Sequence, residues 1–284
     1  MNTILEKKQL SADVFRMKIN APLIAEERKA GQFLILQVDK DYGERIPLTI
    51  ANADAQKGFV EIIFQAVGAT TRKLSRIEPG QKIEALLGPL GQPTHIEKQD
   101  APVVCVGGGI GVAPMYPIVE AHKNAGNKVI VIMGARNKDL LIMEEEMNAL
   151  ADELIVCTDD GSYGRKDLVT IPLKELCESE TPPSEVVAIG PPIMMKFCAE
   201  TTRPFKVKTM VSLNTIMVDG TGMCGGCRVT VGDKTKFVCV DGPEFDGHLV
   251  DFDNMMLRLK SYKDQENHRC QLDIQAHELE EKRK

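Results

Sequence analysis

The chain has 284 residues and a mass of 31.3 kDa, enough to bury the core of one or two domains, and its net charge of −6 argues against broad attraction to nucleic acid. Apolar residues make up 43% and charged residues 27%, and no apolar run approaches the roughly 18 residues that cross a bilayer, so we expect no membrane span. Charges interrupt the first twenty residues where a signal peptide needs an apolar stretch, which favours a cytoplasmic protein.

Short β-rich runs dominate residues 1–97. Segments 14–19, 33–38, 59–64 and 82–87 alternate or are rich in apolar and β-branched residues, and Gly and Pro separate them. This pattern is typical of an antiparallel barrel or sandwich. We therefore expect an antiparallel β-barrel over residues 1–97.

Buried-type strands alternate with helical segments in residues 98–210. The nearly continuous apolar runs are PVVCVGG, KVIVIMGA, ELIVCT and EVVAIG, and segments 113–125 and 141–152 between them have helical patterns. This alternation predicts a parallel-sheet α/β domain with helices on its faces.

A glycine-rich turn follows the first of these strands and opens a helix. Its candidate binding residues are Gly107, Gly108, Gly109, Gly111, Val112, Ala113 and Pro114. Glycines there let backbone N–H groups and the helix N-terminus approach a pyrophosphate, although such corners also use Gly simply to turn. The GxGxxG spacing and a strand-terminal acid about 20 residues on are missing, which favours a single-nucleotide-half variant over the ordinary two-half fold.

Three later loops end the other parallel strands and are expected at the same ligand-binding edge. They supply Arg136, then Asp159, and then Gly190, Pro191 and Met194. Asp159 or Asp160 can accept a ribose hydroxyl, but an Asp-Gly-Ser turn needs no ligand to explain it. The charged residues at this edge favour neither NADH nor NADPH. Arg136 or Arg165 suits the 2′-phosphate of NADPH, whereas Asp159 would repel it.

Three of the eight cysteines are clustered in a Gly-rich stretch after residue 210. Cys224, Cys227 and Cys239 offer soft thiolates with a C-x2-C core, which suits an iron–sulfur cluster or zinc. Cys270 is a reserve ligand, and His248 would complete a rival Cys3His zinc site. We therefore expect a metal-binding module with a charged helical tail over residues 211–284.

The barrel and the α/β half together resemble the ferredoxin–NADP reductase superfamily. The resemblance rests on the order of RIPLT, IFQ, GATT, GGGIGVAP and GPPIMM. It implies an FAD-binding barrel followed by a nicotinamide-binding domain. The implied FAD residues are Arg45, Ile46, Pro47, Leu48, Thr49, Ile63, Phe64, Gln65, Gly68, Thr70 and Thr71. Arg45 stands four residues before Thr49, where the family pattern has three, so the role of Arg45 is less firmly implied than that of its segment.

The cysteine cluster resembles the iron–sulfur module of the dihydroorotate dehydrogenase electron-transfer subunit. That family has a Cys five positions before the C-x2-C pair, where this chain has Asp219. An oxygen ligand there is chemically allowed, although Asp219-Gly220 is also a good turn. The phrases ERIPLTI, MVDGTGMCGGC and PEFDGHLVDF are most similar to the small-subunit family of NADH-dependent ferredoxin:NADP oxidoreductase, also described as sulfide dehydrogenase, whose members carry Asp at this position.

These resemblances imply an electron carrier between NAD(H), FAD and a [2Fe–2S] cluster. They imply a heterodimer with a larger flavoprotein and iron–sulfur subunit, which handles ferredoxin and NADP in electron bifurcation. Hydride transfer requires no general acid or base, so we expect no catalytic acid–base residue. The alternatives are an electron-transfer subunit of dihydroorotate dehydrogenase and a zinc-stabilised module without catalysis. The tail from Asp253 to Lys284 suits either a solvated helix or a partner-docking one.

Overall fold

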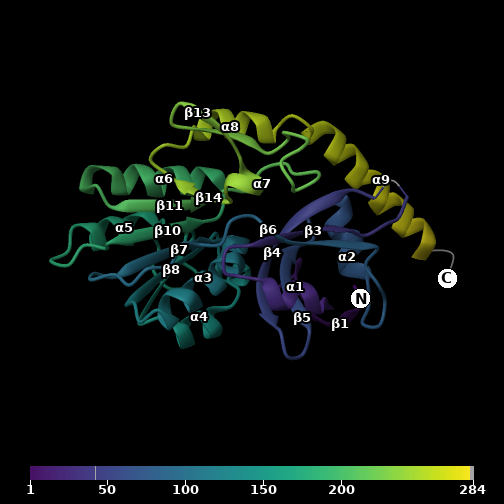
Figure 1. Cartoon of the computed structure of the whole chain (residues 1–284), viewed down its shortest axis with the longest axis horizontal. Coiled ribbons are helices and arrows are strands. Elements are labelled where there is room, and N and C mark those ends of the chain that lie inside the picture. Colours follow the sequence, from purple (N-terminus) through teal and green to yellow (C-terminus); the bar gives the residue numbers. More distant parts are fainter. Residues whose placement is uncertain (42, 282–284) are drawn as a thin grey trace.

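Two six-stranded sheets and a smaller C-terminal module build the fold (Figure 1). The computed structural model describes residues 1–41 and 43–281. Residues 282–284, the last of the predicted C-terminal region, lie outside the described residues. Among the described residues, no helix has the length and apolar character that crossing a membrane requires.

The first sheet is antiparallel throughout and has the strand order β1-β2-β5-β4-β3-β6. Backbone hydrogen bonds of Ile4 with Gly80 and Gln81 join β1 to the segment that leads into β6, and the arrangement confirms the predicted barrel. The elements are β1 (Ile4–Gln9), β2 (Val14–Asn20), α1 (Pro22–Glu27), β3 (Phe33–Gln37), β4 (Arg45–Asp54), β5 (Phe59–Gln65), α2 (Ala69–Arg76) and β6 (Ala85–Leu90).

Alternation along β5 explains how the barrel packs on the next domain. Ile62 and Phe64 point into the barrel core, whereas Ile63, on the other face, belongs to the apolar cluster around α3. One strand therefore contributes to two cores. Arg16 on β2 adds a 2.8 Å ion pair to Glu146 on α4, which also joins the two domains.

The second sheet has the order β14-β11-β10-β7-β8-β9, and all its strands are parallel except the edge strand β14. This confirms the predicted parallel α/β domain. Its elements are β7 (Val103–Gly108), η1 (Gly109–Gly111), α3 (Val112–Asn124), β8 (Val129–Ala135), η2 (Lys138–Leu140), α4 (Glu144–Leu150), β9 (Glu153–Thr158), α5 (Thr170–Cys177), β10 (Glu185–Ile189), α6 (Pro192–Thr202), η3 (Arg203–Phe205) and β11 (Lys208–Ser212).

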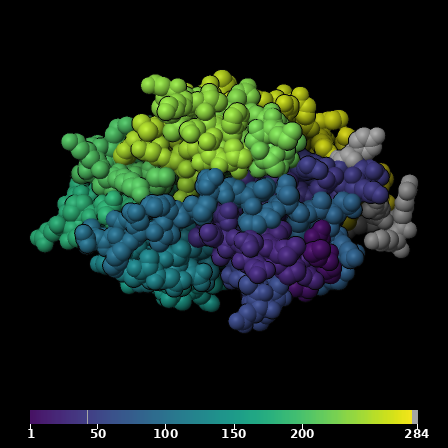
Figure 2. All heavy atoms as spheres, viewed as in Figure 1, coloured from purple at the N-terminus to yellow at the C-terminus, as the bar shows by residue number. Residues whose placement is uncertain are grey.

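The C-terminal module lies across both domains (Figures 1 and 2). It contains β12 (Arg228–Val231), β13 (Lys234–Phe237), α7 (Val238–Asp241), β14 (Glu244–Asp246), α8 (Phe252–Leu259) and α9 (Lys263–Glu281). The predicted boundary at residue 210 falls inside β11, and β14 returns to pair with that strand. Chain segments on both sides of the boundary thus complete one sheet.

The structure divides the charged tail into two different helices. Phe252 and Met255 of α8 are buried in the core shared with the α/β domain, and Asp251 caps the helix by accepting a hydrogen bond from the Asn254 N–H at 3.0 Å. In contrast, α9 runs outward past α2 of the barrel (Figure 1). Packing therefore fixes α8, and polar contacts with α2 orient α9.

Candidate functional site

The strand order reverses between β7 and β10, and this is the point where open α/β sheets bind ligands. The turns after these two strands pack directly on one another. A Cβ on Gly190 would lie 2.8 Å from Met194 Cε and 3.1 Å from the Gly108 Cα, and a Cβ on Gly108 would overlap Met194 Sδ. Glycine at both positions thus allows the close approach of the two turns and of Met194.

The first of these turns leaves backbone exposed to a ligand. Gly109 adopts a φ of 55°, and no heavy atom lies within 4 Å of the place where its Cβ would be. The turn runs into α3, whose first residues Val112 and Ala113 are buried and hold the helix end in place. Open backbone at the N-terminus of a thirteen-residue helix fits a pyrophosphate.

The ends of β8 and β9 bring the other predicted nucleotide residues to the same edge. Arg136 and Asp159 are both exposed, and the Asp159 N–H donates to the Ala135 carbonyl at 3.1 Å. The carboxylate of Asp159 makes no hydrogen bond or ion pair with the residues that the structure describes. It is therefore available to a ribose hydroxyl.

Two residues considered for this edge are already engaged. Arg165 makes ion pairs with Asp167 at 2.9 Å and with Glu175 at 2.7 Å, and these partners raise the pKa of its guanidinium. Asp160 accepts the Ser162 N–H at 2.9 Å, which lowers the pKa of Asp160 and closes the turn. Arg136 and Asp159 are the better candidates for contact with a nucleotide.

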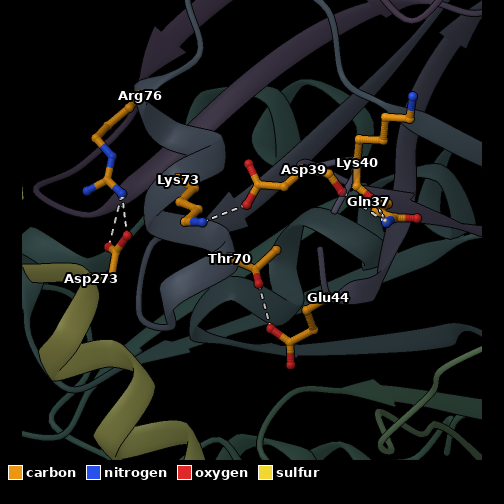
Figure 3. A network of polar contacts seen from close by, with 8 residues as sticks. All are labelled: Gln37, Asp39, Lys40, Glu44, Thr70, Lys73, Arg76 and Asp273. Atoms are coloured by element: carbon orange, nitrogen blue, oxygen red, sulfur yellow. Dashed lines mark hydrogen bonds and ion pairs between the residues drawn. The ribbon is translucent and has the colours of Figure 1, made fainter. Parts of the chain in front are cut away.

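In the barrel, three candidate flavin residues, Gly68, Thr70 and Thr71, lie at the N-terminus of α2. Gly68 caps the helix: its N–H donates to Thr71 Oγ1 at 3.0 Å, and the Thr71 hydroxyl donates back to the Gly68 carbonyl at 3.1 Å. The Thr70 hydroxyl donates to Glu44 Oε2 at 2.5 Å (Figure 3). Arg72, one turn into the helix, has a buried Nε without a hydrogen-bond partner among the described residues.

The strand residues of the flavin segment differ in what they can offer. Arg45 is exposed at the start of β4, where its Nε lies 3.4 Å from Gln37 Oε1, and residues 46–49 are half-buried. Phe64 is 1% exposed and stacks on Phe15 inside the barrel, so its ring is occupied by packing. Gln65 donates to Asp13 at 2.8 Å. The guanidinium of Arg45 and the first turn of α2 are the donors that fit a pyrophosphate.

The cysteine region brings two of the three predicted thiols together. Cys227 Sγ and Cys239 Sγ lie 3.3 Å apart and are buried, whereas Cys224 is exposed on the turn before them. Burial raises the pKa of Cys239 to about 12, and the hydrogen bond from Cys227 acts in the same direction. The Cys239 thiol would ionise near neutral pH only if a cation compensated its charge, which is what a metal centre supplies.

Asp219 organises the turn that carries Cys224. Its Oδ1 accepts the Thr221 N–H at 2.9 Å and its Oδ2 accepts the Cys224 N–H at 2.7 Å. The hydrogen bond from Thr221, followed by that from Cys224, lowers the pKa of this carboxyl. The carboxylate is therefore ionised, and each oxygen retains a lone pair for a metal.

The two reserve ligands lie elsewhere. His248 Nε2 is 2.9 Å from Thr202 Oγ1, and its other ring nitrogen faces Asp246. Cys270 lies on α9, where its Sγ contacts the Val67 carbonyl of the barrel. Within residues 1–41 and 43–281, no three His, Cys, Asp or Glu side chains are already gathered as a metal site. A cluster would draw Cys224 toward the Cys227–Cys239 pair.

Sequence reasoning missed two residues that the structure places near these sites. Glu44 precedes the predicted Arg45 and contacts Thr70 across 26 positions of sequence. Glu244 accepts a hydrogen bond from Thr94 at 2.6 Å, at the junction of barrel, sheet and module. Both stand within phrases that carry the family resemblance, ERIPLTI and PEFDGHLVDF, but those phrases gave neither acid a role. An unpaired acid beside the RIPLT segment was the available signal for Glu44.

Two family models match parts of the chain. The iron–sulfur cluster binding domain of dihydroorotate dehydrogenase B matches residues 214–251, which include Asp219 and the three clustered cysteines. The oxidoreductase NAD-binding domain matches residues 105–200, which include the turns after β7 and β10. Both matches fall on the segments that the geometry selects.

Curated relatives are similar to this chain over most of its length. A Thermotoga maritima protein described as a dihydroorotate dehydrogenase B (NAD(+)) electron transfer subunit homolog is 46% identical, over 94% of this chain and 93% of that protein. The Fusobacterium nucleatum dihydroorotate dehydrogenase B (NAD(+)) electron transfer subunit is 31% identical, over 86% and 95%. A solved chain from the NADH-dependent reduced ferredoxin-NADP oxidoreductase, studied for flavin-based electron bifurcation, is 45% identical with a TM-score of 0.89 and covers 95% of this chain and 96% of that one.

Proposed function

This chain belongs to the family of dihydroorotate dehydrogenase B electron-transfer subunits and their homologues, and on that basis we propose that it passes electrons between NAD(H), FAD and a [2Fe–2S] cluster to a larger flavoprotein partner. The whole complex would be an electron-bifurcating NADH-dependent ferredoxin:NADP oxidoreductase. The observation that carries the proposal is the 45% identity, over 95% of the chain, to a subunit of such an enzyme.

The residues at the β7–β10 crevice would bind and orient the nicotinamide cofactor. The open backbone at Gly109 would bind the pyrophosphate, and Asp159 would accept the ribose hydroxyls. Pro191 and Met194 close the crevice from the β10 side and exclude water. This orienting role needs no proton-transferring side chain.

The barrel and the module would hold the two electron carriers. Arg45 and the first turn of α2 bind the FAD pyrophosphate, and Cys224, Cys227 and Cys239 bind the cluster iron. A bound FAD would supply hydride exchange with a nicotinamide and single-electron exchange with a cluster. The module packs on the barrel strand β3, where a Cβ on Gly220 would lie 2.8 Å from Ile35 Cγ1. This tight contact supports electron transfer between the two parts.

Asp219 is our proposed fourth cluster ligand. Its ionised carboxylate lies in the same turn as Cys224, and an oxygen ligand changes the potential of a cluster relative to four thiolates. Asp219→Cys should keep the iron and shift both the visible spectrum and the potential. Asp219→Asn should lower iron content. An unchanged spectrum and iron content in both variants would show that Asp219 acts only in the turn.

Anaerobic purification with iron, sulfide and flavin analysis tests the proposed function directly. About two irons, two sulfides and one FAD per chain are expected from a [2Fe–2S] flavoprotein. Reduction of both chromophores by NADH, followed by complex formation with a large flavoprotein subunit, completes the test. Protein prepared in this way without FAD and sulfide would refute the proposal.

The second candidate function is electron transfer to the catalytic subunit of a dihydroorotate dehydrogenase. The curated relatives that carry that name favour it. The two functions differ in the partner. Orotate-linked NADH turnover with a dihydroorotate dehydrogenase catalytic subunit would favour the second candidate. NADP-linked ferredoxin turnover with a large flavoprotein would favour the first.

A further inference from the structure

Three residues along one side of α2 each contact a carboxylate from outside the helix (Figure 3). Lys73 pairs with Asp39 at 2.6 Å, and Arg76 pairs with Asp273 of α9 at 2.7 Å. At the third position the helix residue is not a cation: the Thr70 hydroxyl donates to Glu44 at 2.5 Å. Across the described part of the chain, Glu44 forms no ion pair. Its charge is thus left uncompensated beside the candidate flavin site.

The Thr70–Glu44 hydrogen bond fixes what both groups can offer a ligand. A hydroxyl has one proton, and Thr70 donates it in the hydrogen bond to Glu44. Toward a ligand, Thr70 then presents lone pairs, and the second carboxylate oxygen of Glu44 is also an acceptor. Thr70 is 7% exposed and held by the helix, whereas Glu44 is exposed. The exposed carboxylate of Glu44 therefore lies beside the first turn of α2, and the largely buried Thr70 hydroxyl holds it there.

Acceptors of this kind select the chemistry of their ligand. A phosphate oxygen would meet repulsion from Glu44 and no proton from Thr70, whereas a hydroxyl can donate to either oxygen. A flavin dinucleotide carries hydroxyls on both sides of its pyrophosphate, on the ribityl chain and on the adenosine ribose. Cationic Arg45 follows Glu44 directly and suits the phosphates in between.

We propose that Glu44 and Thr70 form a subsite for the flavin's hydroxyl groups. The inference rests on the proposed FAD site at α2. In that site the acceptor pair would bind hydroxyl groups and not the phosphates. In this arrangement Glu44 is a specificity residue: it favours a ligand with a polyol next to the pyrophosphate.

Flavin titration of two variants tests the subsite. Glu44→Ala removes the charged acceptor at an exposed position, and Thr70→Val removes the hydroxyl without changing side-chain shape. Each should weaken FAD binding about tenfold or more, since a hydrogen bond to a charged group is lost. Quenching of flavin fluorescence on deflavinated, cluster-containing full-length protein measures the affinity. Circular dichroism checks that the variants fold.

Asp39→Ala is the matched control, because it removes the same charge from the same connecting segment but faces Lys73 rather than a hydroxyl. Its FAD affinity should stay within about threefold of wild type. Lumiflavin, which has no ribityl chain, should bind wild type and Glu44→Ala equally. Riboflavin identifies the hydroxyls: a parallel loss of riboflavin and FAD affinity assigns the ribityl chain, and a loss of FAD affinity alone assigns the ribose.

Several results would overturn the inference. Unchanged or tighter FAD binding by Glu44→Ala would show that Glu44 is neutral or competes with the pyrophosphate. Equal weakening by Asp39→Ala, or of lumiflavin, would show a general effect on the segment. In all these cases wild type still binds FAD and the proposed function stands. Wild-type protein that binds no flavin would instead remove the proposed function itself.

Discussion

Cys227 and Cys239 lie with their sulfurs 3.3 Å apart, although eleven residues, including the whole β12–β13 hairpin, separate them in sequence. The hairpin pairs Arg228 with Phe237, and these residues directly follow Cys227 and precede the first turn of α7. Strand pairing therefore brings the two thiols together. The hairpin is the scaffold of the cluster site.

This arrangement predicts which cysteines hold iron. Cys227→Ser and Cys239→Ser should each lose most of the iron and inorganic sulfide and bleach the visible cluster bands, because a hard oxygen replaces a soft thiolate. Cys270→Ser is the control, since Cys270 contacts the barrel at Val67. Anaerobic metal and sulfide analysis measures the difference. Full cluster content in Cys239→Ser would contradict the assignment.

The parallel strands were predictable from sequence because they are buried on both faces. Runs such as Val103–Val106 and Val129–Met133 are continuous and apolar, and the structure buries every one of these residues. In contrast, β11 is a five-residue strand with alternating burial beside a Gly-rich region, and β14 has three residues. Their strand character comes from pairing, of β11 with β10 and of β14 with β11, which a local pattern does not reveal.

The candidate sites divide in the same way. Glycines at 108 and 190 stand in local turn motifs, so sequence could select them, while the reason for glycine emerges only from the contact between the turns. Glu44 and Glu244 lie within the phrases ERIPLTI and PEFDGHLVDF, and Arg72 follows GATT, but no motif gives these three residues a role. Their partners are 26 or more residues away or absent among the described residues, and no spacing rule indicates them.

The contact between the turns predicts that Gly108→Ala impairs use of NADH. Gly108 has a φ of −111°, which alanine tolerates, so the effect is steric: the new methyl group overlaps Met194 and lies 3.1 Å from Pro191. A small displacement of the crevice should lower kcat/KM for NADH about tenfold or more. Steady-state reduction of ferricyanide by NADH measures it, with FAD content expected to be unchanged.

Gly232→Ala is the control for Gly108→Ala, because it introduces backbone strain without a steric overlap. Gly232 has a φ of 59° in the β12–β13 turn and no atom within 4 Å of its Cβ position. It should lower stability slightly and leave KM for NADH as in wild type. Equal kinetic effects of the two substitutions would count against the crevice.

The buried carboxyl of Glu244 should make the stability of the protein depend on pH. Burial between barrel and sheet, with a smaller effect of Glu185, raises the pKa of Glu244 to about 7, against hydrogen bonding from Thr94 and the charge of Lys208. The folded protein then binds more protons than the unfolded chain between about pH 4.5 and 7, so stability falls as pH rises through this window. The loss is up to about 3 kcal/mol.

Glu244→Gln should remove that loss, because glutamine keeps an acceptor for Thr94 and never ionises. At pH 8 the variant should be more stable than wild type, and at pH 5 the two should be similar. Urea unfolding at both pH values measures the difference, and Glu78→Gln, at an exposed position, is the control. A Gln variant less stable at pH 8 would contradict the assigned pKa.

The contact of Asp273 with Arg76 should attach α9 to α2. Its carboxylate receives both hydrogen bonds from Arg76, at 2.7 and 3.0 Å, and its side chain is 9% exposed (Figure 3). Asp273→Asn should release α9 from α2, so amide exchange in α9 should become several-fold faster while the barrel strands stay protected. Asp264→Asn, exposed on the same helix, should leave exchange unchanged. Equal exchange rates in both variants would show that other contacts hold α9.

The carboxylate of Asp159 should determine whether the protein prefers NADH or NADPH. Its exposed carboxylate stands at the end of β9 without a cationic partner among the described residues, and Arg165 is held by Asp167 and Glu175. A 2′-phosphate would be repelled there, whereas ribose hydroxyls would donate to the carboxylate, so wild type should prefer NADH. Asp159→Asn should narrow the ratio of kcat/KM for NADH over NADPH about tenfold, mainly through KM.

Asp160→Asn separates this effect from the turn itself. Asp160 closes the same loop by accepting the Ser162 N–H, and asparagine can make that bond through its side-chain oxygen. The variant should therefore keep the wild-type ratio. A wild-type preference for NADPH would show that Arg136, exposed at the end of β8, dominates the site, because its guanidinium can neutralise a 2′-phosphate. Arg136→Ala would then lose NADPH use while NADH use persists.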